Sequence, residues 1–210
     1  MAKLLYIKAS PRAARSHSVA VADAFVEAYR AAHPSDELRT LDLFQANLPA
    51  FDGLAVQAKY TILHGKQHTA EELAAWRAVE AIIADFKAAD KYALAVPMWN
   101  FGIPYRLKQY LDILIQPGYT FSYDPEKGYT GLVTGKPAFV AYARGGEYPE
   151  GTPGEAYDLQ KKYLELALGF IGFTDIRSVV VEPTLMGGPD VAAAKQAQAI
   201  AKAKALAARF

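Results

Sequence analysis

Apolar residues recur along this chain with two periods, and the two periods alternate. Helical spacing, as in Val19, Ala22, Phe25 and Val26, separates short stretches that are typical of buried strands. Strands that alternate with helices predict a parallel sheet with helices on both faces. The predicted strands are residues 4–9, 37–43, 92–96, 137–143 and 176–181.

Sequence signals mark where several of the helices begin and end. Thr69 followed by Glu72 has the spacing of a capping box, and Pro104 suits the first turn of a helix. Proline after His33 ends the first helix, because proline restricts the residue before it. The predicted helices run from about residue 19 to 33, 70 to 86, 104 to 116, 156 to 171 and 191 to 208.

Two segments depart from this alternation. Residues 44–69 lose periodicity and carry turn signals, so we expect an excursion with one short helix near 56–63. Residues 120–123 and 129–133 flank a turn that contains proline and glycine, which predicts an inserted hairpin. The whole chain, 1–210, is therefore predicted to be one α/β domain, a five-stranded doubly wound sheet with a small hairpin.

Composition narrows the classes of function. The formal charge is +1 with both signs spread along the chain, which argues against nucleic acid or a membrane surface as partner. Cysteine is absent, so redox chemistry would need a bound cofactor. No secretory segment or apolar run of roughly 18 residues is present, and we expect a cytoplasmic protein. His64 and His68 lack a third ligand, so no metal site is predicted.

The first candidate site is the loop of residues 10–18, between the first strand and helix. Serine hydroxyls and the N–H groups of a helix N-terminus suit a phosphomonoester. The loop contains no glycine, so it is neither a dinucleotide turn nor a nucleotide loop. Ser16 or Ser18 acting only as a helix cap remains the alternative. Arg12 and Arg15 are expected to be solvated.

The second candidate is the junction after the third strand, Pro97, Met98, Trp99, Asn100 and Phe101. Extended backbone and two aromatic rings can receive a flat heterocycle, and Gly102 is expected to let the chain turn closely past it. The aromatic rings could equally belong to the core. An amide between two aromatic residues needs a partner, which favours a ligand.

The third candidate follows the fourth strand at Ala143, Arg144, Gly145 and Gly146. Adjacent glycines allow backbone amides to form a small donor nest, although a tight turn without a ligand fits as well. All three loops follow the carboxyl ends of strands. They are therefore predicted to converge at one edge of the sheet, where α/β folds bind ligands.

With these motifs the chain resembles the FMN-dependent NADH azoreductases of the flavodoxin-like NAD(P)H quinone reductase group. The resemblance spans nearly the whole chain and rests also on residues 107–110, 131–136 and 168–172. It implies a flavodoxin-like fold and a homodimer with pockets at the subunit interface. The family often has serine at the position of Ala143 and tyrosine at that of Trp99.

The resemblance also implies roles for individual residues. Ser10, Ser16, His17 and Ser18 would hold the FMN phosphate, and the junction that begins at Pro97 and Met98 would line the isoalloxazine. The backbone of Ala143 and the residues Arg144, Gly145 and Gly146 would contact its pyrimidine end. The implied substrate pocket combines four aromatic residues, of which the last two would reach over the flavin of the other subunit or have structural roles: Trp99, Phe101, Tyr123 and Phe170.

The implied reaction is two-electron, ping-pong hydride transfer from NADH or NADPH through FMN to an acceptor. The sequence ranks neither the nicotinamide donors nor the acceptors, which include quinones, azo compounds and nitroaromatic compounds. The competing hypothesis is a flavodoxin-like FMN electron carrier without a small-molecule substrate. Such carriers usually have a strongly acidic surface, whereas the charge here is balanced.

Overall fold

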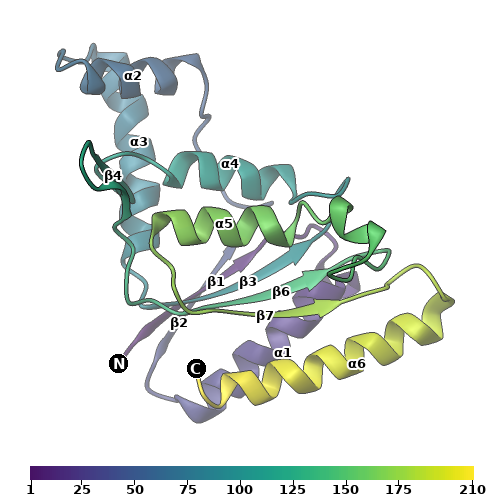
Figure 1. Ribbon diagram of the computed structural model, residues 1–210. Coiled ribbons are helices and arrows are strands. Elements are labelled where there is room, and N and C mark those ends of the chain that lie inside the picture. Colours follow the sequence, from purple (N-terminus) through teal and green to yellow (C-terminus); the bar gives the residue numbers. More distant parts are fainter.

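The computed structural model describes all 210 residues and is built on a five-stranded sheet in which all neighbouring strands are parallel (Figure 1). The strand order is β2–β1–β3–β6–β7, a doubly wound order of the flavodoxin type, so the predicted fold class is confirmed. The strands are β1 (Lys3–Lys8), β2 (Glu37–Asp42), β3 (Lys91–Pro97), β6 (Ala138–Ala143) and β7 (Ile176–Val181).

Helices cover both faces of this sheet. In Figure 1, α1 and α6 lie below it and α4 and α5 lie above it. The predicted alternation of strands and helices is confirmed. The α-helices are α1 (His17–Ala32), α2 (Gly53–Leu63), α3 (Ala70–Lys87), α4 (Tyr105–Leu114), α5 (Lys161–Ile171) and α6 (Gly188–Ala207). Two short 3₁₀ helices are η1 (Ala13–Arg15) and η2 (Pro153–Tyr157).

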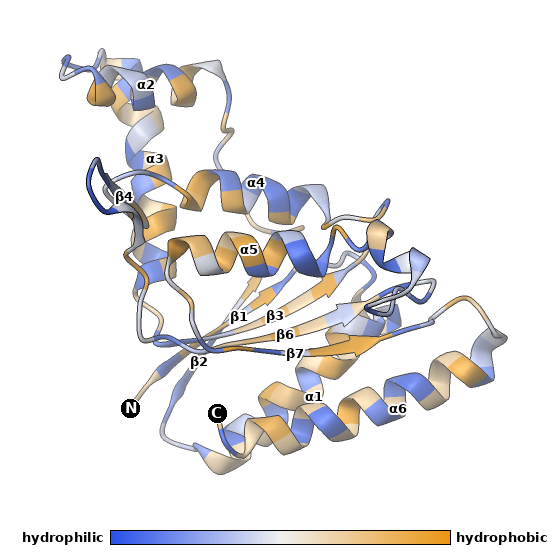
Figure 2. Cartoon of the chain, viewed as in Figure 1, coloured by the Kyte–Doolittle hydropathy of each residue, from blue (hydrophilic) through white to orange (hydrophobic).

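Alternate residues of each central strand serve opposite hydrophobic cores. Tyr6 and Phe139 belong to the core between the sheet and helices α1 and α6. Ile7 and Val140 belong to the core between the sheet and helices α3, α4 and α5. Because both faces are covered, the central strands are largely hydrophobic, while the helices carry mixed stripes (Figure 2). The two periods of the sequence therefore correspond to a buried sheet and half-buried helices.

The segment without periodicity forms more helix than expected. α2 extends over Gly53–Leu63 rather than over a short piece near 56–63. It begins early because the Asp52 carboxylate accepts hydrogen bonds from the N–H groups of Leu54 and Ala55. α2 packs on the first turns of α3, and together they project beyond the sheet (Figure 1). The predicted Thr69–Glu72 capping box of α3 is confirmed.

One helix starts later than its sequence pattern predicts. The expected helix from 156 begins only at Lys161, because η2 and residues 158–160 precede it. The Asp158 carboxylate accepts the N–H of Lys161 and pairs with Arg144, so this residue serves a tertiary contact instead of extending the helix. α6, in contrast, begins at Gly188, three residues before the expected Val191.

The predicted inserted hairpin is present as β4 (Phe121–Asp124) and β5 (Gly128–Gly131), which pair antiparallel. It packs on the end of α5 so closely that a Cβ atom on Gly131 would lie 2.3 Å from the nitrogen of Gly172.

None of the helices has both the length and the apolar character that spanning a membrane requires.

Candidate functional site

Three loops meet at the carboxyl edge of the sheet, as the sequence predicts. They follow β1, β3 and β6, which are adjacent in the sheet. The register aligns Lys8 with Ala95 and Pro97 with Ala143, so the three strands end at nearly the same level. The N–H of Met98 donates to the carbonyl of Ala143, at 2.8 Å, and joins the second loop to the third.

The loop from Ser10 to Ser18, here called the serine loop, gathers three buried hydroxyl groups. Ser16 and Ser18 have their Oγ atoms 3.2 Å apart, and Ser10 Oγ accepts the N–H of Arg12 at 3.4 Å. Ser16 is also the N-cap of α1, accepting the N–H of Val19 at 3.4 Å. Ser16 therefore caps the helix, and the helix start leaves N–H groups outside the intrahelical ladder. A phosphate role for Ser16 and Ser18 stays a prediction. Hydroxyl and amide donors are thus concentrated at one helix end.

The arginine and histidine side chains of the serine loop have no hydrogen bond to these hydroxyls. Arg12 and Arg15 are exposed, as expected. His17 lies at the first position of α1, and its Nδ1 is 2.5 Å from Oε1 of Gln196 on α6. The imidazole therefore faces α6, and His17 offers the serine loop its backbone N–H.

The four residues from Trp99 to Gly102, here called the platform turn, form a tight hairpin. The backbones of Trp99 and Gly102 exchange two hydrogen bonds of 3.0 Å. Within this turn, positive φ values occur at Asn100, at 47°, and Phe101, at 70°; the other non-glycine residue with a positive φ is Ala13 in the serine loop. The left-handed positions of the turn precede Gly102, so the tight turn is made by residues with a Cβ, and the close approach of Gly102 to a ring stays a prediction. Such φ values cost about 1–2 kcal/mol each in residues with a Cβ, somewhat less in asparagine.

The platform turn presents aromatic side chains beside a cleft. Phe101 is 46% exposed, and its ring lies 5.3 Å from that of Tyr157. Trp99 lies 5.6 Å from Phe44 between ring centroids. Neither aromatic residue of the turn is buried in the core, which favours the ligand interpretation. The adjoining cleft has a volume of about 730 Å³ and is lined by Ala50, Phe51, Asp52, Trp99, Asn100, Ile103, Tyr105, Lys108, Gln109 and Asp112.

The charged residues that line this cleft are Asp52, which caps α2, and the pair formed by Lys108 and Asp112. Lys108 Nζ donates to the Asp112 carboxylate at 2.6 Å, one helical turn along α4. That hydrogen bond raises the pKa of Lys108, so its ammonium group is fully charged near neutral pH. The cleft therefore combines an aromatic wall with one paired cation.

Two residues that sequence reasoning missed attach the segment before α2 to α4, next to this cleft. Arg106 donates from Nε to the carbonyl of Leu43 at 2.8 Å, and Gln109 donates to the carbonyl of Pro49 at 3.0 Å. These bonds hold the irregular segment before α2 against α4. Both side chains lie on the polar stripe of a helix, and no signal in the sequence specifies carbonyl groups some 60 residues away as their partners.

The third loop places its charged side chain in the interior. Arg144 is only 3% exposed, and its guanidinium pairs with Asp158 at 2.7 Å and Glu182 at 3.3 Å. Its donors therefore face protein carboxylates. Gly145 accepts the N–H of Leu185 through its carbonyl, so the two glycines lie beneath the β7–α6 connection.

The four predicted pocket residues do not lie together in one chain. Trp99 and Phe101 are at the carboxyl edge, whereas Phe170 is at the far end of α5, in a cluster with Phe121 and Tyr129. Tyr123 is on the hairpin and 61% exposed. α5 starts beside Asp158 and runs back along the sheet toward the hairpin (Figure 1). Tyr123 and Phe170 are therefore remote from the platform turn of their own chain.

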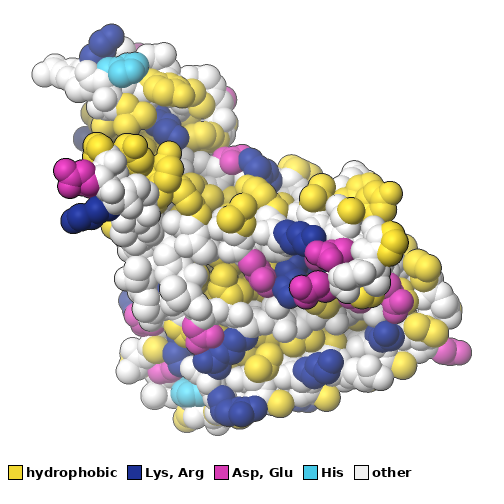
Figure 3. Space-filling view, in the orientation of Figure 1, with side chains coloured by type: hydrophobic (Ala, Val, Ile, Leu, Met, Phe, Trp, Pro, Cys, Tyr) yellow, Lys and Arg dark blue, Asp and Glu magenta, His cyan; other side chains and the backbone are white.

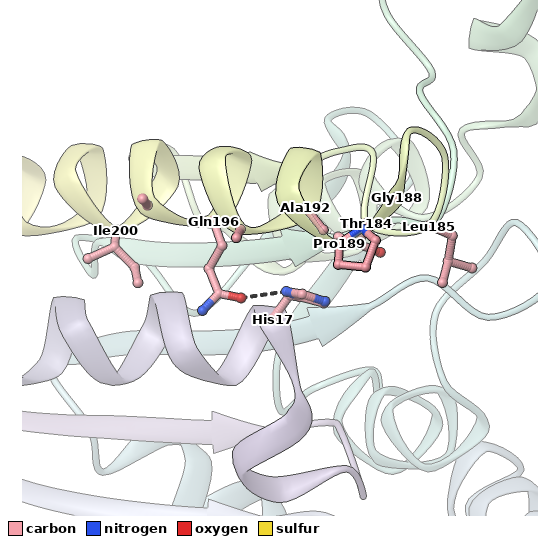
Figure 4. A pocket seen from close by; sticks show the side chains of 10 residues that line it. His17, Thr184, Leu185, Gly188, Pro189, Ala192, Gln196 and Ile200 are labelled. Atoms are coloured by element: carbon pink, nitrogen blue, oxygen red, sulfur yellow. Dashed lines mark hydrogen bonds between the residues drawn. The ribbon is translucent and has the colours of Figure 1, made fainter.

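A second cavity, of about 520 Å³, lies between the N-terminal ends of α1 and α6 (Figure 4). Figure 4 shows Gln196 reaching from α6 toward His17, with Thr184 and Pro189 at one end and Ile200 at the other. It neighbours the serine loop through His17 but is separate from the cleft at the platform turn.

Comparison with known proteins agrees with this architecture. A family model described as having a flavodoxin-like fold matches residues 2–207. An FMN-dependent NADH:quinone oxidoreductase of Nitratidesulfovibrio vulgaris strain DP4 is 63% identical over the full length of both chains. The crystal structure of an azoreductase from Bacillus anthracis str. Sterne covers both chains completely, with 34% identity and a TM-score of 0.92.

A further solved structure contains the cofactor. This FMN-dependent NADH-azoreductase from Bacillus anthracis str. Ames Ancestor, in complex with FMN, is 27% identical, covers 99% of this chain and all of its own, and has a TM-score of 0.85. Fold and site together define a flavodoxin-like protein with a candidate ligand site at the carboxyl edge of its sheet. Within that class, the chain belongs to the family of FMN-dependent NADH:quinone oxidoreductases.

The donor set at the edge fits FMN. Three serine hydroxyls and the free N–H groups at the start of α1 match a phosphate. The exposed aromatic platform turn matches a flat ring. Hydroxyl donors and an aromatic surface on neighbouring strands are what a flavin mononucleotide needs.

Proposed function

We propose that this chain is an FMN-dependent oxidoreductase that passes electrons from NADH to quinones and azo compounds. The observation that carries the proposal is the convergence of the serine loop and the platform turn at one edge, beside an open cleft. Identity of 63% with a quinone oxidoreductase over the whole chain supports it. When bound, FMN accepts a hydride from NADH and later delivers two electrons to the acceptor.

The chain's own residues bind and orient in this proposal. The serine loop binds the phosphate with hydroxyl and N–H donors, and the platform turn supports the ring. The backbone of residues 143–146 faces the pyrimidine end. The cleft beside Trp99 admits a flat donor and then a flat acceptor to the same position, which accounts for a ping-pong order. No side chain needs to act as acid, base or nucleophile.

A direct test is to purify the protein, add FMN and record its visible spectrum before and after NADH. We expect a yellow protein that NADH bleaches and that a quinone or an azo dye restores. Initial rates at several quinone concentrations should give parallel double-reciprocal lines. Protein that neither retains FMN nor accelerates NADH oxidation by a quinone would refute the proposal.

The competing function, an electron carrier without a small-molecule substrate, predicts a different result. A carrier would be reduced by a partner protein and would show no saturable dependence on quinone concentration. The names of the relatives, quinone oxidoreductase and azoreductase, favour the enzyme. Assays with nitroaromatic compounds and with NADPH extend the test to the remaining candidate acceptors and to the other donor.

The proposal includes a homodimer in which Tyr123 and Phe170 of one subunit approach the platform turn of the other. It is supported by the exposure of Tyr123 and Phe101 and by their separation within one chain. Hydrophobic side chains also gather on the projecting end of α2 and α3 (Figure 3), where Tyr60, Ile62 and Leu63 are exposed. Light scattering should give twice the mass of one chain.

Subunit mixing tests the shared site. A Ser16→Ala/Ser18→Ala subunit that loses FMN is mixed with a Tyr123→Ala subunit that keeps it. If Tyr123 acts across the interface, the hybrid has one complete site and regains about a quarter of wild-type activity, from one site in half of the randomly formed dimers. Activity no higher than that of the unmixed variants would count against the shared pocket.

A cytoplasmic location stays a prediction.

A further inference from the structure

The guanidinium of Arg144 is bound by other residues of the chain. All three of its nitrogens have partners: Nε donates to Gln160 Oε1 at 2.9 Å, Nη2 to Asp158 at 2.7 Å and Nη1 to Glu182 at 3.3 Å. A buried cation is costly unless it is paired and hydrogen-bonded, and breaking one pair leaves an uncompensated charge. The guanidinium therefore fixes the positions of Asp158 and Gln160.

The residues that Arg144 fixes contact the platform turn at Phe101 and the strand that leads into it at Val96. Gln160 is fully buried, and its Nε2 donates to the carbonyl of Val96 at 2.8 Å, directly before Pro97. The N–H of Leu159 donates to the carbonyl of Phe101 at 3.1 Å. Residues 158–160 thus connect the buried cation to the backbone on either side of Trp99 and Asn100.

The platform turn needs such external support. Asn100 and Phe101 both have left-handed φ values, which side chains with a Cβ rarely adopt. Unfavourable conformations of this kind persist only where the surroundings over-determine them. The two reciprocal bonds between Trp99 and Gly102 close the turn, whereas the bond from Leu159 ties Phe101 to a segment that Gln160 anchors on β3.

We propose that Arg144 is a positioning residue that, through Asp158 and Gln160, holds the platform turn in the conformation that receives the flavin ring. The inference rests on the proposed FMN function. It assigns the arginine side chain to the support of residues 97–102 and leaves contact with the flavin to the backbone. Arg144 and Gln160 should then act as one unit, and their substitutions should have similar consequences for the ring.

The test uses two variants that each keep a positive charge at position 144 opposite Asp158. Gln160→Met has a similar shape but lacks both the acceptor for Arg144 and the donor to Val96. Arg144→Lys keeps the charge but cannot bond to Gln160 and Asp158 with the same fork. Matched controls are Gln198→Met at an exposed site of α6 and Arg177→Lys in the exposed pair with Asp175. Each protein is titrated with FMN and with riboflavin, which lacks the phosphate.

We expect Gln160→Met and Arg144→Lys to bind FMN and riboflavin more weakly by the same factor, about tenfold. Amide hydrogen exchange in the apoprotein should accelerate within residues 97–104 and stay unchanged in β1 and α1. The reduction potential of bound FMN should shift in both variants and in neither control. If Arg144→Lys fails to fold, Gln160→Met still tests the inference, because it leaves every charge of the cluster in place. If Gln160→Met fails to fold, Arg144→Lys provides the test.

Three outcomes would overturn the inference. Affinities within twofold of wild type for both variants would show that the platform turn needs no support from Arg144. A defect in Arg144→Lys alone would assign the guanidinium to direct flavin contact. Faster exchange over the whole sheet would assign it to general stability. Failure of the wild-type protein to bind FMN would instead refute the proposed function, while exchange in the apoprotein would still report on the support.

Discussion

The serine loop and the platform turn lie on neighbouring strands at one edge, yet they are held in different ways. Bonds within the serine loop join residues two or three positions apart, such as Ser10 with Arg12 and Ser16 with Val19. The platform turn depends on the segment 158–160, in which Leu159 donates to the carbonyl of Phe101 and Gln160 binds the Val96 carbonyl 64 positions away. The proposed phosphate site is therefore built by local contacts, whereas the proposed ring site is built by contacts between distant parts of the chain.

The largest expected effect is on flavin affinity, and it separates the serine loop from the platform turn because FMN has a phosphate and riboflavin does not. Ser16→Ala combined with Ser18→Ala should weaken FMN binding roughly 100-fold or more, because each hydroxyl contact to a charged group contributes about 1.5–3 kcal/mol. Riboflavin affinity should stay within about twofold, since riboflavin lacks the phosphate. Fluorescence titration of both flavins measures the ratio. Equal losses for the two flavins would mean that the serine loop shapes the ring site as well.

A smaller effect is expected from the backbone of the platform turn. Asn100→Val should lower the free energy of unfolding by about 1–2 kcal/mol, because a β-branched side chain tolerates a φ of 47° poorly. Asn100→Gly is the matched variant and should stay within about 0.5 kcal/mol of wild type. Urea denaturation of the apoproteins compares them. If both variants unfold at the wild-type midpoint, the turn is not strained.

The smallest effect concerns the segment that leads to residues 158–160. Glu155 in η2 accepts a hydrogen bond from Lys162 and another from the N–H of Gly151, and both lower its pKa. A carboxyl group with a lowered folded pKa stabilises the fold above its unfolded pKa and loses this contribution as the pH falls through the folded value. The pair is exposed, so the contribution is small.

The urea midpoint of Glu155→Gln should accordingly lie slightly below that of wild type above about pH 5, and the difference should shrink as the pH falls through the lowered folded pKa of Glu155. Glu150→Gln, at an exposed glutamate of the same loop, serves as the control. A midpoint difference that grows on acidification would mean that the folded state raises, rather than lowers, the pKa of Glu155.

Much of the architecture could be predicted because its causes are local or periodic. The Thr69–Glu72 capping box follows from a spacing of three residues, and the strands follow from runs that are buried on both faces. Convergence of the three loops follows from strand polarity alone. The start of α5 could not be predicted, because residues 156–160 have helical periodicity. The pairing of Asp158 with Arg144 keeps these residues out of the helix, which begins at Lys161.

By itself, the sequence determined the doubly wound fold, the serine-rich helix start and the aromatic residues at the third strand's end. These follow from hydrophobic period, capping chemistry and residue type, which act over a few positions. Only the tertiary structure decided that Arg144 is buried and that Asn100 and Phe101 carry the left-handed turn. The physical reason is that a buried charge and an unfavourable backbone conformation are stable only with partners, and those partners come from distant parts of the chain.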